Sequence, residues 1–307
     1  MEPTSQSYAI IDLGTNTFHL LIVALDASRQ LREISRERRF VKLAEGGIEQ
    51  IATAPYARGL AVLHEYRNIL DEHQVTATHL TALGTAALRT ATNGPDFIHD
   101  ALQQTGITID LIPGDREALL IYEGVRHAVL PDEEGMLIMD IGGGSVEFIL
   151  ANIQGVRWSQ SFPIGVAVLY RRFHQHDPIS TDEIHAVRAF LQEALTPLQQ
   201  ALRQYPCHRL VGASGTFDVL EYFLCTGRPG PNWAVVDLER FPSLYQQLVH
   251  STLEERKGME GLPLDRVDMI VVALILVQVV IEIAGITRMD VSAYAMKEGM
   301  LYELMRR

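Results

Sequence analysis

Two segments of the chain, 128 residues apart, share one pattern: an apolar strand, a glycine-containing turn and a second apolar strand. When residues 9–22 are placed over residues 137–150, Asp12 aligns with Asp140 and the turn glycines that follow coincide. A match over a whole strand–turn–strand unit is harder to obtain by chance than a single shared Asp-x-Gly, so it indicates an internal repeat. The pattern therefore predicts two similar domains that face each other.

The order of the predicted elements favours an α/β fold. A length of 307 residues suits two domains of about 150 residues each. Predicted strands alternate with predicted helices, and the two hairpins make each sheet mixed. A polar turn at 130–135 is the expected boundary, with residues 1–130 in the first domain and 131–296 in the second. The expected strands are 8–12, 18–25, 78–83, 107–112, 136–140, 146–151 and 209–212, and the expected helices are 59–73, 96–105, 116–128, 181–204, 238–251, 265–284 and 297–307.

The composition excludes several classes of partner. The chain has 26 Lys and Arg against 38 Asp and Glu, a net charge of −12, and such a surface repels nucleic acid and anionic membranes. The most hydrophobic stretch, 269–281, is too short to cross a hydrocarbon layer of about 30 Å. Cys207 and Cys225 form no C-x-x-C pair, which favours a reducing compartment. Residues 1–7 lack the features of a signal peptide, so we expect a cytoplasmic protein.

Each hairpin turn combines an aspartate with glycine and hydroxyl residues, a composition that suits phosphate and metal binding. Glycines let the backbone approach an anion, and successive N–H groups form a nest for phosphate oxygens. Because a carboxylate repels phosphate, Asp12 and Asp140 are expected to hold Mg²⁺ or its waters. The alternative is a pair of ordinary hairpins in which aspartate only forms the turn. The candidate phosphate-binding residues in the turns are Gly14, Thr15, Asn16, Gly142, Gly143, Gly144 and Ser145.

Three further segments carry candidate residues. The loop of Ser214, Gly215 and Thr216 follows a predicted strand, and it suits either phosphate binding or a plain strand-to-helix turn capped by Thr216. Arg89 lies about one helical turn beyond a strand, where its guanidinium suits either a phosphate or a neighbouring carboxylate. Glu117 stands in the first turn of a predicted helix, where spacing alone favours an interaction with the helix dipole.

Six motifs follow one another along the whole chain, at residues 9–19, 84–89, 112–118, 138–147, 212–216 and 296–303. Together they resemble the exopolyphosphatase/guanosine pentaphosphate phosphohydrolase family, within the actin/hexokinase/Hsp70-like fold. The Asp-x-Gly element alone is shared by that entire superfamily, whereas the set of six is highly specific. Where relatives often have Gly-Ser-Asn-Ser, this chain has Gly-Thr-Asn-Thr at 14–17, and Lys297 stands where Arg is common. Longer family members carry an additional C-terminal helical domain.

The resemblance implies two ribonuclease-H-like domains with the active site in the cleft between them, and a last helix, 297–307, that returns to the first domain. Glu117 matches the proposed general base of the family, which replaces the helix-dipole interpretation. The implied reaction is attack of water on the terminal phosphorus of polyphosphate or of guanosine pentaphosphate. Mg²⁺ near Asp140 and Glu147, with Asp12 from the other hairpin, is expected to neutralise charge.

Two other functions stay open from the sequence. An ATPase or kinase of the same superfold would need an adenine pocket near residues 212–216 and a base placed for a sugar hydroxyl. A non-catalytic sensor would bind an alarmone or nucleotide without turnover, and the presence of Arg89, Glu117, Asp140 and Glu147 disfavours it. The choice between polyphosphate and guanosine pentaphosphate, and between a monomer and a homodimer, also stays open.

Overall fold

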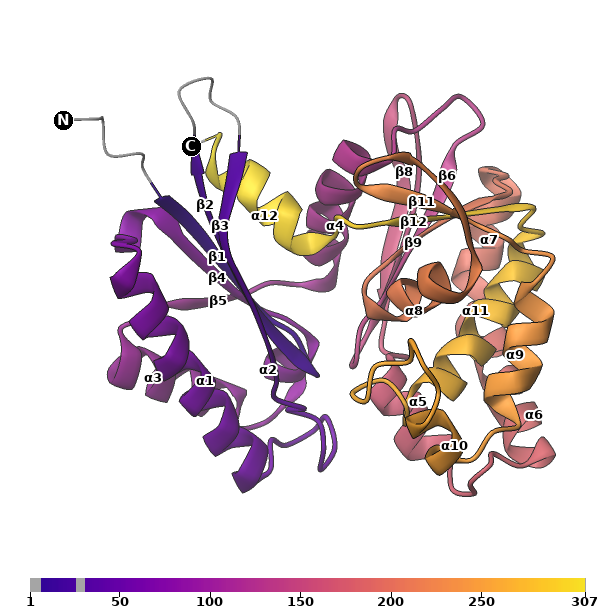
Figure 1. Ribbon diagram of the computed structural model, residues 1–307, viewed down its shortest axis with the longest axis horizontal. Helices are drawn as coiled ribbons and strands as arrows, with labels where there is room; N and C mark the ends of the chain where they lie inside the picture. The colour runs from indigo at the N-terminus through magenta and orange to yellow at the C-terminus, as the bar shows by residue number, and fades with distance from the viewer. Residues whose placement is uncertain (1–6, 26–30, 307) are drawn as a thin grey trace. The chain divides into compact units, whose positions relative to one another are not determined.

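The chain folds into two compact units in the computed structural model, which describes residues 7–25 and 31–306 (Figure 1). Unit 1 comprises Met1–Leu120 and Met296–Arg307, and unit 2 comprises Ile121–Ala295. Helix α4 (Gly114–Ala128) runs from one unit into the other, so residues 121–130 group with unit 2 rather than with the first domain. Residues 1–6, which carry most of the signal-peptide interpretation, lie outside the described residues.

Unit 1 is built on a five-stranded mixed sheet in the order β3-β2-β1-β4-β5. β1 pairs antiparallel with β2 and parallel with β4, as the hairpin and crossover pattern of the sequence predicts. The β3 strand was absent from the sequence prediction because its many charged residues hide the apolar alternation on which strand prediction depends. The strands are β1 (Ser7–Leu13), β2 (Thr17–Leu25), β3 (Leu31–Phe40), β4 (Leu80–Gly84) and β5 (Ile109–Leu111).

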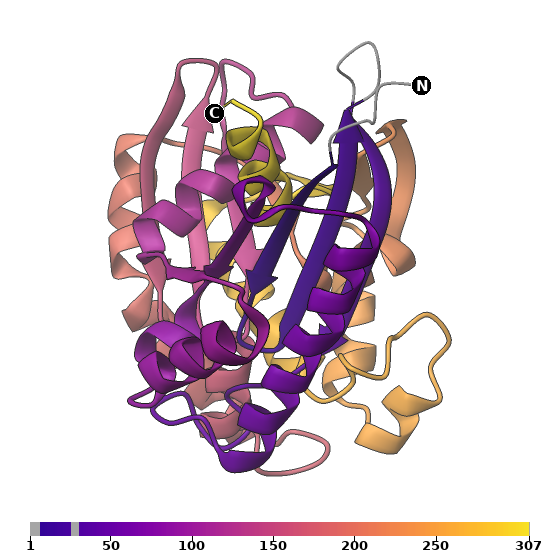
Figure 2. The same cartoon turned by 90° about the vertical axis from the view of Figure 1, so that its left-hand side faces the viewer.

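The helices of unit 1 cover both faces of this sheet (Figures 1 and 2). Helices α1 (Thr53–Glu72) and α3 (Gly94–Thr105) enclose the apolar core, and α12 (Met296–Leu304) packs against β1 on the other face. Alternation along β1 sends Ile11 into the α1–α3 core and Asp12 to the opposite face. The shorter helices are η1 (Ala77–His79) and α2 (Ala86–Thr90).

Unit 2 contains a seven-stranded mixed sheet in the order β10-β11-β12-β9-β6-β7-β8. The run β8-β7-β6-β9-β12 has the same order and the same strand directions as β3-β2-β1-β4-β5 of unit 1. The duplication and the mixed α/β fold predicted from the sequence are therefore confirmed. The strands are β6 (Met136–Ile141), β7 (Val146–Asn152), β8 (Gly155–Phe162), β9 (Arg209–Ala213), β10 (Cys225–Gly230), β11 (Trp233–Val236) and β12 (Arg288–Ser292).

The helices of unit 2 enclose a second core against one face of its sheet. The sequence predicts one helix over 181–204, but the structure has two, because Pro197 cannot continue the preceding helix and begins the next one. The apolar helix α11 is buried in this core, and no helix among residues 7–25 and 31–306 is long and apolar enough to cross a membrane. The helices are α5 (Val166–Phe173), α6 (Thr181–Ala194), α7 (Thr196–Gln204), α8 (Gly215–Leu224), α9 (Phe241–Val249), α10 (Leu253–Lys257) and α11 (Ile270–Ala284).

In unit 1 the backbone after the third strand forms hydrogen bonds with the carbonyls of the hairpin turn. We use the word strap for the residues that follow the third strand of each unit and donate N–H groups to the carbonyls of the turn. In unit 1, Val41 and Lys42 donate to the carbonyl of Asn16 at 2.9 and 3.0 Å, and Leu43 donates to that of Thr15 at 2.8 Å. Lys42 has a positive φ of 48°, which is uncommon outside glycine and shows that its neighbours hold the strap in shape.

The strap of unit 2 makes the equivalent contacts with the glycine turn. Gly165, Val166 and Ala167 donate their N–H groups to the carbonyls of residues 144, 142 and 143 at 3.2, 3.0 and 2.9 Å. Gly165 also packs on the turn backbone so closely that an added Cβ would lie 2.4 Å from the carbonyl carbon of Gly143. The turn carbonyls are therefore satisfied on one side by the strap.

We expect Gly165→Ala to destabilise unit 2, because its methyl group would collide with backbone atoms that cannot move aside. The expected loss is about 1–3 kcal/mol, measured by urea unfolding. Gly227→Ala is the matched control, since nothing lies within 4 Å of a Cβ there, and its expected change is below about 0.5 kcal/mol. Equal unfolding midpoints for the two variants would contradict the close packing of strap and turn.

Candidate functional site

The two hairpins place their aspartates at equivalent positions of equivalent turns. Asp12 pairs across the hairpin with His19, and Asp140 pairs with Glu147. Each turn is closed by a backbone hydrogen bond, from Gly14 to the carbonyl of residue 17 at 3.1 Å and from Gly142 to that of residue 145 at 3.0 Å. A Cβ on either glycine would lie 2.9 Å from that carbonyl oxygen, so each turn requires glycine there.

The glycine turn of unit 2 is shaped to bind an anion. Its carbonyls are held by the strap, and in the described part of the chain the N–H groups of Gly143 and Gly144 have no protein acceptor. Consecutive N–H groups with no partner form an anion-binding concavity. Ser145 is buried in the same turn and can add a hydroxyl donor. The predicted phosphate-binding residues of this turn are thus brought together.

A pair of buried carboxylates lies beside this turn. Asp140 and Glu147 are 6% and 1% exposed, and they face each other directly across β6 and β7. Like charges at directly opposed positions of a sheet repel, so a cation held between the two carboxylates would relieve that repulsion. No group of three or more His, Cys, Asp or Glu that could hold a metal occurs in the described ranges. Mg²⁺ requires only one or two carboxylates together with water and phosphate oxygens, so this donor pair fits that ion.

Two serine hydroxyls hold the carboxylates of this pair. Ser161 Oγ donates to Glu147 Oε1 at 2.7 Å, and Ser214 Oγ donates to Asp140 Oδ1. The hydroxyl of Ser214, a predicted phosphate ligand, is therefore engaged with a carboxylate in this structure. Ser214 itself is the N-cap residue of α8, so the structure differs from the alternative in which Thr216 caps the helix. Gly215 and Thr216 form the first buried residues of α8.

Unit 1 brings Glu117 together with Arg89. Glu117 is 7% exposed and lies in the first turn of α4, where its N–H donates to the carbonyl of Pro113 at 3.0 Å. Arg89 stands in the last turn of α2, and its Nη1 lies 3.3 Å from Glu117 Oε2 and donates to the carbonyl of Ile112 at 2.6 Å. Of the two partners that the sequence allowed for Arg89, the structure shows the carboxylate, and that carboxylate is the candidate general base.

Two residues of the site region were not predicted from the sequence. The guanidinium of Arg266 packs on Gly215, since a Cβ at that glycine would lie 1.9 Å from Nη2 of Arg266. The chain between them includes a strand pair and two helices, so the sequence carried no signal for this contact. His19 lies between Asp12 and Arg38 in strand register, and it occupies the position of Glu147 in the repeat. The repeat offset could have identified His19.

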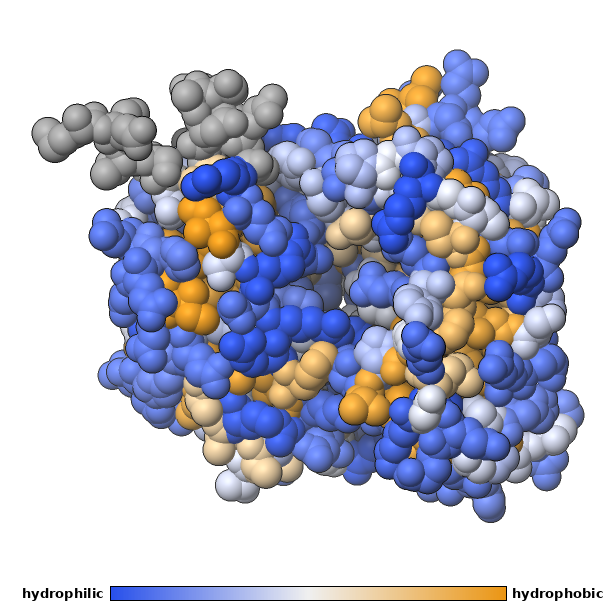
Figure 3. Space-filling model, viewed as in Figure 1, coloured by the Kyte–Doolittle hydropathy of each residue, from blue (hydrophilic) through white to orange (hydrophobic). Residues whose placement is uncertain are grey.

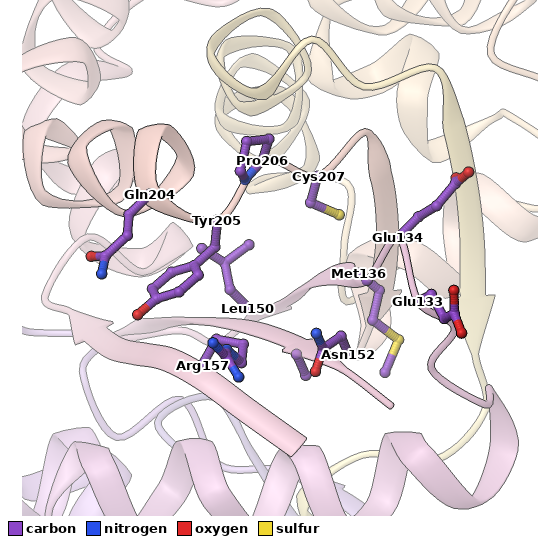
Figure 4. A pocket seen from close by; sticks show the side chains of 12 residues that line it. Glu133, Glu134, Met136, Leu150, Asn152, Arg157, Gln204, Tyr205, Pro206 and Cys207 are labelled. Carbon is purple, nitrogen blue, oxygen red and sulfur yellow. The ribbon is translucent and has the colours of Figure 1, made fainter. Parts of the chain in front are cut away.

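A pocket of about 220 Å³ lies at the other end of the unit 2 sheet, near the start of β6 (Figure 4). Arg157 and Tyr205 lie side by side in its wall, with the guanidinium carbon 5.3 Å from the ring centroid. No predicted site residue lines this pocket. The face seen in Figure 3 is largely hydrophilic, with smaller apolar patches on both units.

A protein-family model and a curated relative both match nearly the whole chain. The model of the Ppx/GppA phosphatase family matches residues 21–307. A guanosine-5'-triphosphate,3'-diphosphate pyrophosphatase of Photobacterium profundum is 30% identical over 306 residues, which cover 99% of this chain and 60% of that protein. The chain thus spans about 60% of the length of this curated relative.

Solved structures match over nearly the full length. The crystal structure of an exopolyphosphatase from Cytophaga hutchinsonii has a TM-score of 0.92 and 38% identity, with 98% of both chains covered. A Ppx/GppA family member from Aquifex aeolicus has a TM-score of 0.80 and 24% identity, again with 98% of both chains covered, and this likeness concerns the fold alone.

We expect Asp140→Asn to weaken the stabilisation of the protein by divalent cations. The amide removes one charge of the buried pair and can still accept the hydrogen bond of Ser214, so without metal the variant should gain about 0.2–1 kcal/mol. Mg²⁺ at about 100 times its Kd should stabilise the native protein by about 2.7 kcal/mol and the variant far less. The measurement is the thermal unfolding midpoint in EDTA and in MgCl₂.

The matched control for this test is Asp110→Asn, which changes an exposed aspartate of β5 in the same chemical way. The control should show the same Mg²⁺-dependent increase in midpoint as the native protein. An equally large Mg²⁺ effect in Asp140→Asn would remove the carboxylate pair from metal binding.

Proposed function

The chain belongs to the Ppx/GppA phosphatase family, and on this basis we propose that it is a divalent-cation-dependent phosphohydrolase of phosphoanhydride bonds. Its proposed substrates are inorganic polyphosphate, from which it releases terminal orthophosphate, and guanosine pentaphosphate, which it converts to the tetraphosphate. The observation that carries the proposal is the N–H nest of Gly143 and Gly144 beside the buried pair of Asp140 and Glu147. That combination suits phosphate oxygens and a cation together.

In the proposed reaction, unit 2 binds the phosphoryl group and its counterion. The N–H groups of Gly143 and Gly144 donate to phosphoryl oxygens, and Ser145 adds its hydroxyl. When held by Asp140 and Glu147, Mg²⁺ supplies positive charge that stabilises the phosphoryl oxygens. The guanidinium of Arg266, packed on Gly215, extends this binding region toward the first turn of α8. Gly215 and Thr216 are proposed to bind a phosphate further along the substrate.

Unit 1 supplies the base in this proposal. Glu117 takes the proton of the attacking water, and Arg89 holds the carboxylate in place through its contact with Oε2. The turn of Gly14, Thr15 and Asn16 is proposed to donate to the substrate as its counterpart in unit 2 does. Asp12 is proposed as a further metal ligand.

Mg²⁺ and a cytoplasmic location belong to the same proposal. The donor pair is made of carboxylate oxygens, which suit Mg²⁺ better than a soft metal. Cys207 and Cys225 are both free thiols, as a reducing compartment favours.

We expect Glu117→Gln to lower phosphate release by about 10²–10⁴-fold, because the amide cannot take a proton from water. Release is measured with Mg²⁺ from short polyphosphate, long polyphosphate, guanosine pentaphosphate and ATP. Asp115→Asn is the matched control, since Asp115 is an exposed carboxylate in the same helical turn, and it should retain activity.

The same panel of substrates separates the alternatives. Turnover of polyphosphate or guanosine pentaphosphate that depends on Glu117 would support the proposed function. Release from ATP alone would indicate an ATPase of the same superfold, and tight binding without release would indicate a sensor. Equal rates for the native protein and Glu117→Gln would remove Glu117 from the role of base.

A further inference from the structure

Four polar side chains form a row in unit 2, three of them on the neighbouring strands β8, β7 and β6 and the fourth, Ser214, directly after β9. Ser161 of β8 faces Glu147 of β7, which faces Asp140 of β6. Asp140 in turn pairs with Ala213 of β9, and Ser214 follows directly. Cross-strand partners share one face of a sheet, and the hydrogen bond from Ser214 to Asp140 completes the row, so the two carboxylates lie between two hydroxyls.

The hydroxyls at both ends of the row donate inward. Ser161 Oγ donates to Glu147 Oε1 at 2.7 Å, a normal length for a hydrogen bond from a hydroxyl to a carboxylate. Ser214 Oγ donates to Asp140 Oδ1. A hydroxyl carries one hydrogen, so each serine commits it to one named oxygen and limits the rotation of that carboxylate. The row therefore fixes the orientation of the pair as well as its position.

The backbone of Ser214 adopts a conformation that is unfavourable for a residue with a side chain. Ser214 has φ 73° and ψ 176°, a region that is essentially restricted to glycine. A residue with a Cβ in such a region is strained, and it persists only where the surrounding structure holds it there. Glycine would avoid that strain, but it would also remove the donor to Asp140. The strain therefore points to a role for the hydroxyl at this position.

Ser161 is the serine of β8 whose cross-strand partner is acidic. Ser161 and Ser159 lie on the same face of β8, because side chains alternate along a strand. Ser159 faces Ile149, whereas Ser161 faces the carboxylate of Glu147. Two serines on one strand thus differ in whether they meet an acidic group.

We propose that Ser161 is a positioning residue for the acidic pair, with Ser214 as its counterpart at the other end of the row. The two hydroxyls hold Glu147 and Asp140 in the orientation that binds a divalent cation. Partners of metal ligands commonly affect metal affinity by about 10–100-fold, although they do not touch the metal. This inference rests on the proposed function for its cation, and it concerns the affinity for that cation rather than the chemical step.

The test is calorimetric titration of MgCl₂ into the full chain in the absence of any phosphate substrate. We expect Ser161→Ala to weaken Mg²⁺ binding by about 10-fold. Ser161→Thr keeps the hydroxyl, and its Mg²⁺ affinity should lie within about 3-fold of that of the native protein. Valine has nearly the shape of threonine but no hydroxyl, so Ser161→Val should bind Mg²⁺ as weakly as the alanine variant. Ser159→Ala is the matched control and should bind as the native protein does.

Ser214→Gly separates positioning from a purely structural role. Glycine relieves the backbone strain, so the unfolding midpoint in EDTA should be equal to or above that of the native protein. Mg²⁺ binding should nevertheless weaken by about 10-fold, because the donor to Asp140 is lost. A structural role alone would lower the midpoint and leave the affinity unchanged.

Several outcomes would overturn the inference. These are native affinity in Ser161→Ala or Ser161→Val, no rescue by Ser161→Thr, and failure of the native protein to bind Mg²⁺. Failure of the proposed function is a different result, namely the expected order of Mg²⁺ affinities without phosphate release from any substrate. In that case the positioning role of Ser161 stands and the proposed reaction does not.

Discussion

The repulsion between Asp140 and Glu147 constrains the surrounding structure of unit 2. Like charges on directly opposed residues of a sheet repel, and burial removes water that would otherwise screen them. Fixed cross-strand register prevents the two side chains from moving apart along the sheet. Two hydroxyl donors, Ser161 and Ser214, meet this concentrated negative charge, and a bound cation would offset it further.

The two units show how one scaffold diverges after duplication. Their sheets share strand order, hairpin register and turn hydrogen bonds, yet the position of Glu147 holds His19 in unit 1. Ser214 donates to an aspartate, whereas the residue at the corresponding register position of unit 1 is Gly84, which has no hydroxyl. Unit 1 instead carries Glu117 and Arg89 on its helices. The candidate roles are therefore divided between the units rather than duplicated.

The fold was predictable from sequence wherever local pattern and tertiary environment agree, as in the hairpins that contain Asp12 and Asp140. Charged side chains obscure the alternation of the edge strand β3, and the break between α6 and α7 depends on a single proline, Pro197, within an otherwise helical pattern. Of the site, residues within motifs were predictable. The contact of Arg266 with Gly215 was not, because it depends on how distant segments pack.

The glycine turn of unit 2 and the strap that binds it constrain each other in sequence. Because residues 142–144 present their carbonyls to residues 165–167 and leave no room for a side chain at Gly165, the two segments form one cooperative module. A substitution that moved the turn backbone would also disturb the hydrogen bonds of residues 165–167. Altered substrate selectivity is therefore better sought by exchanging both segments together from a homologous chain.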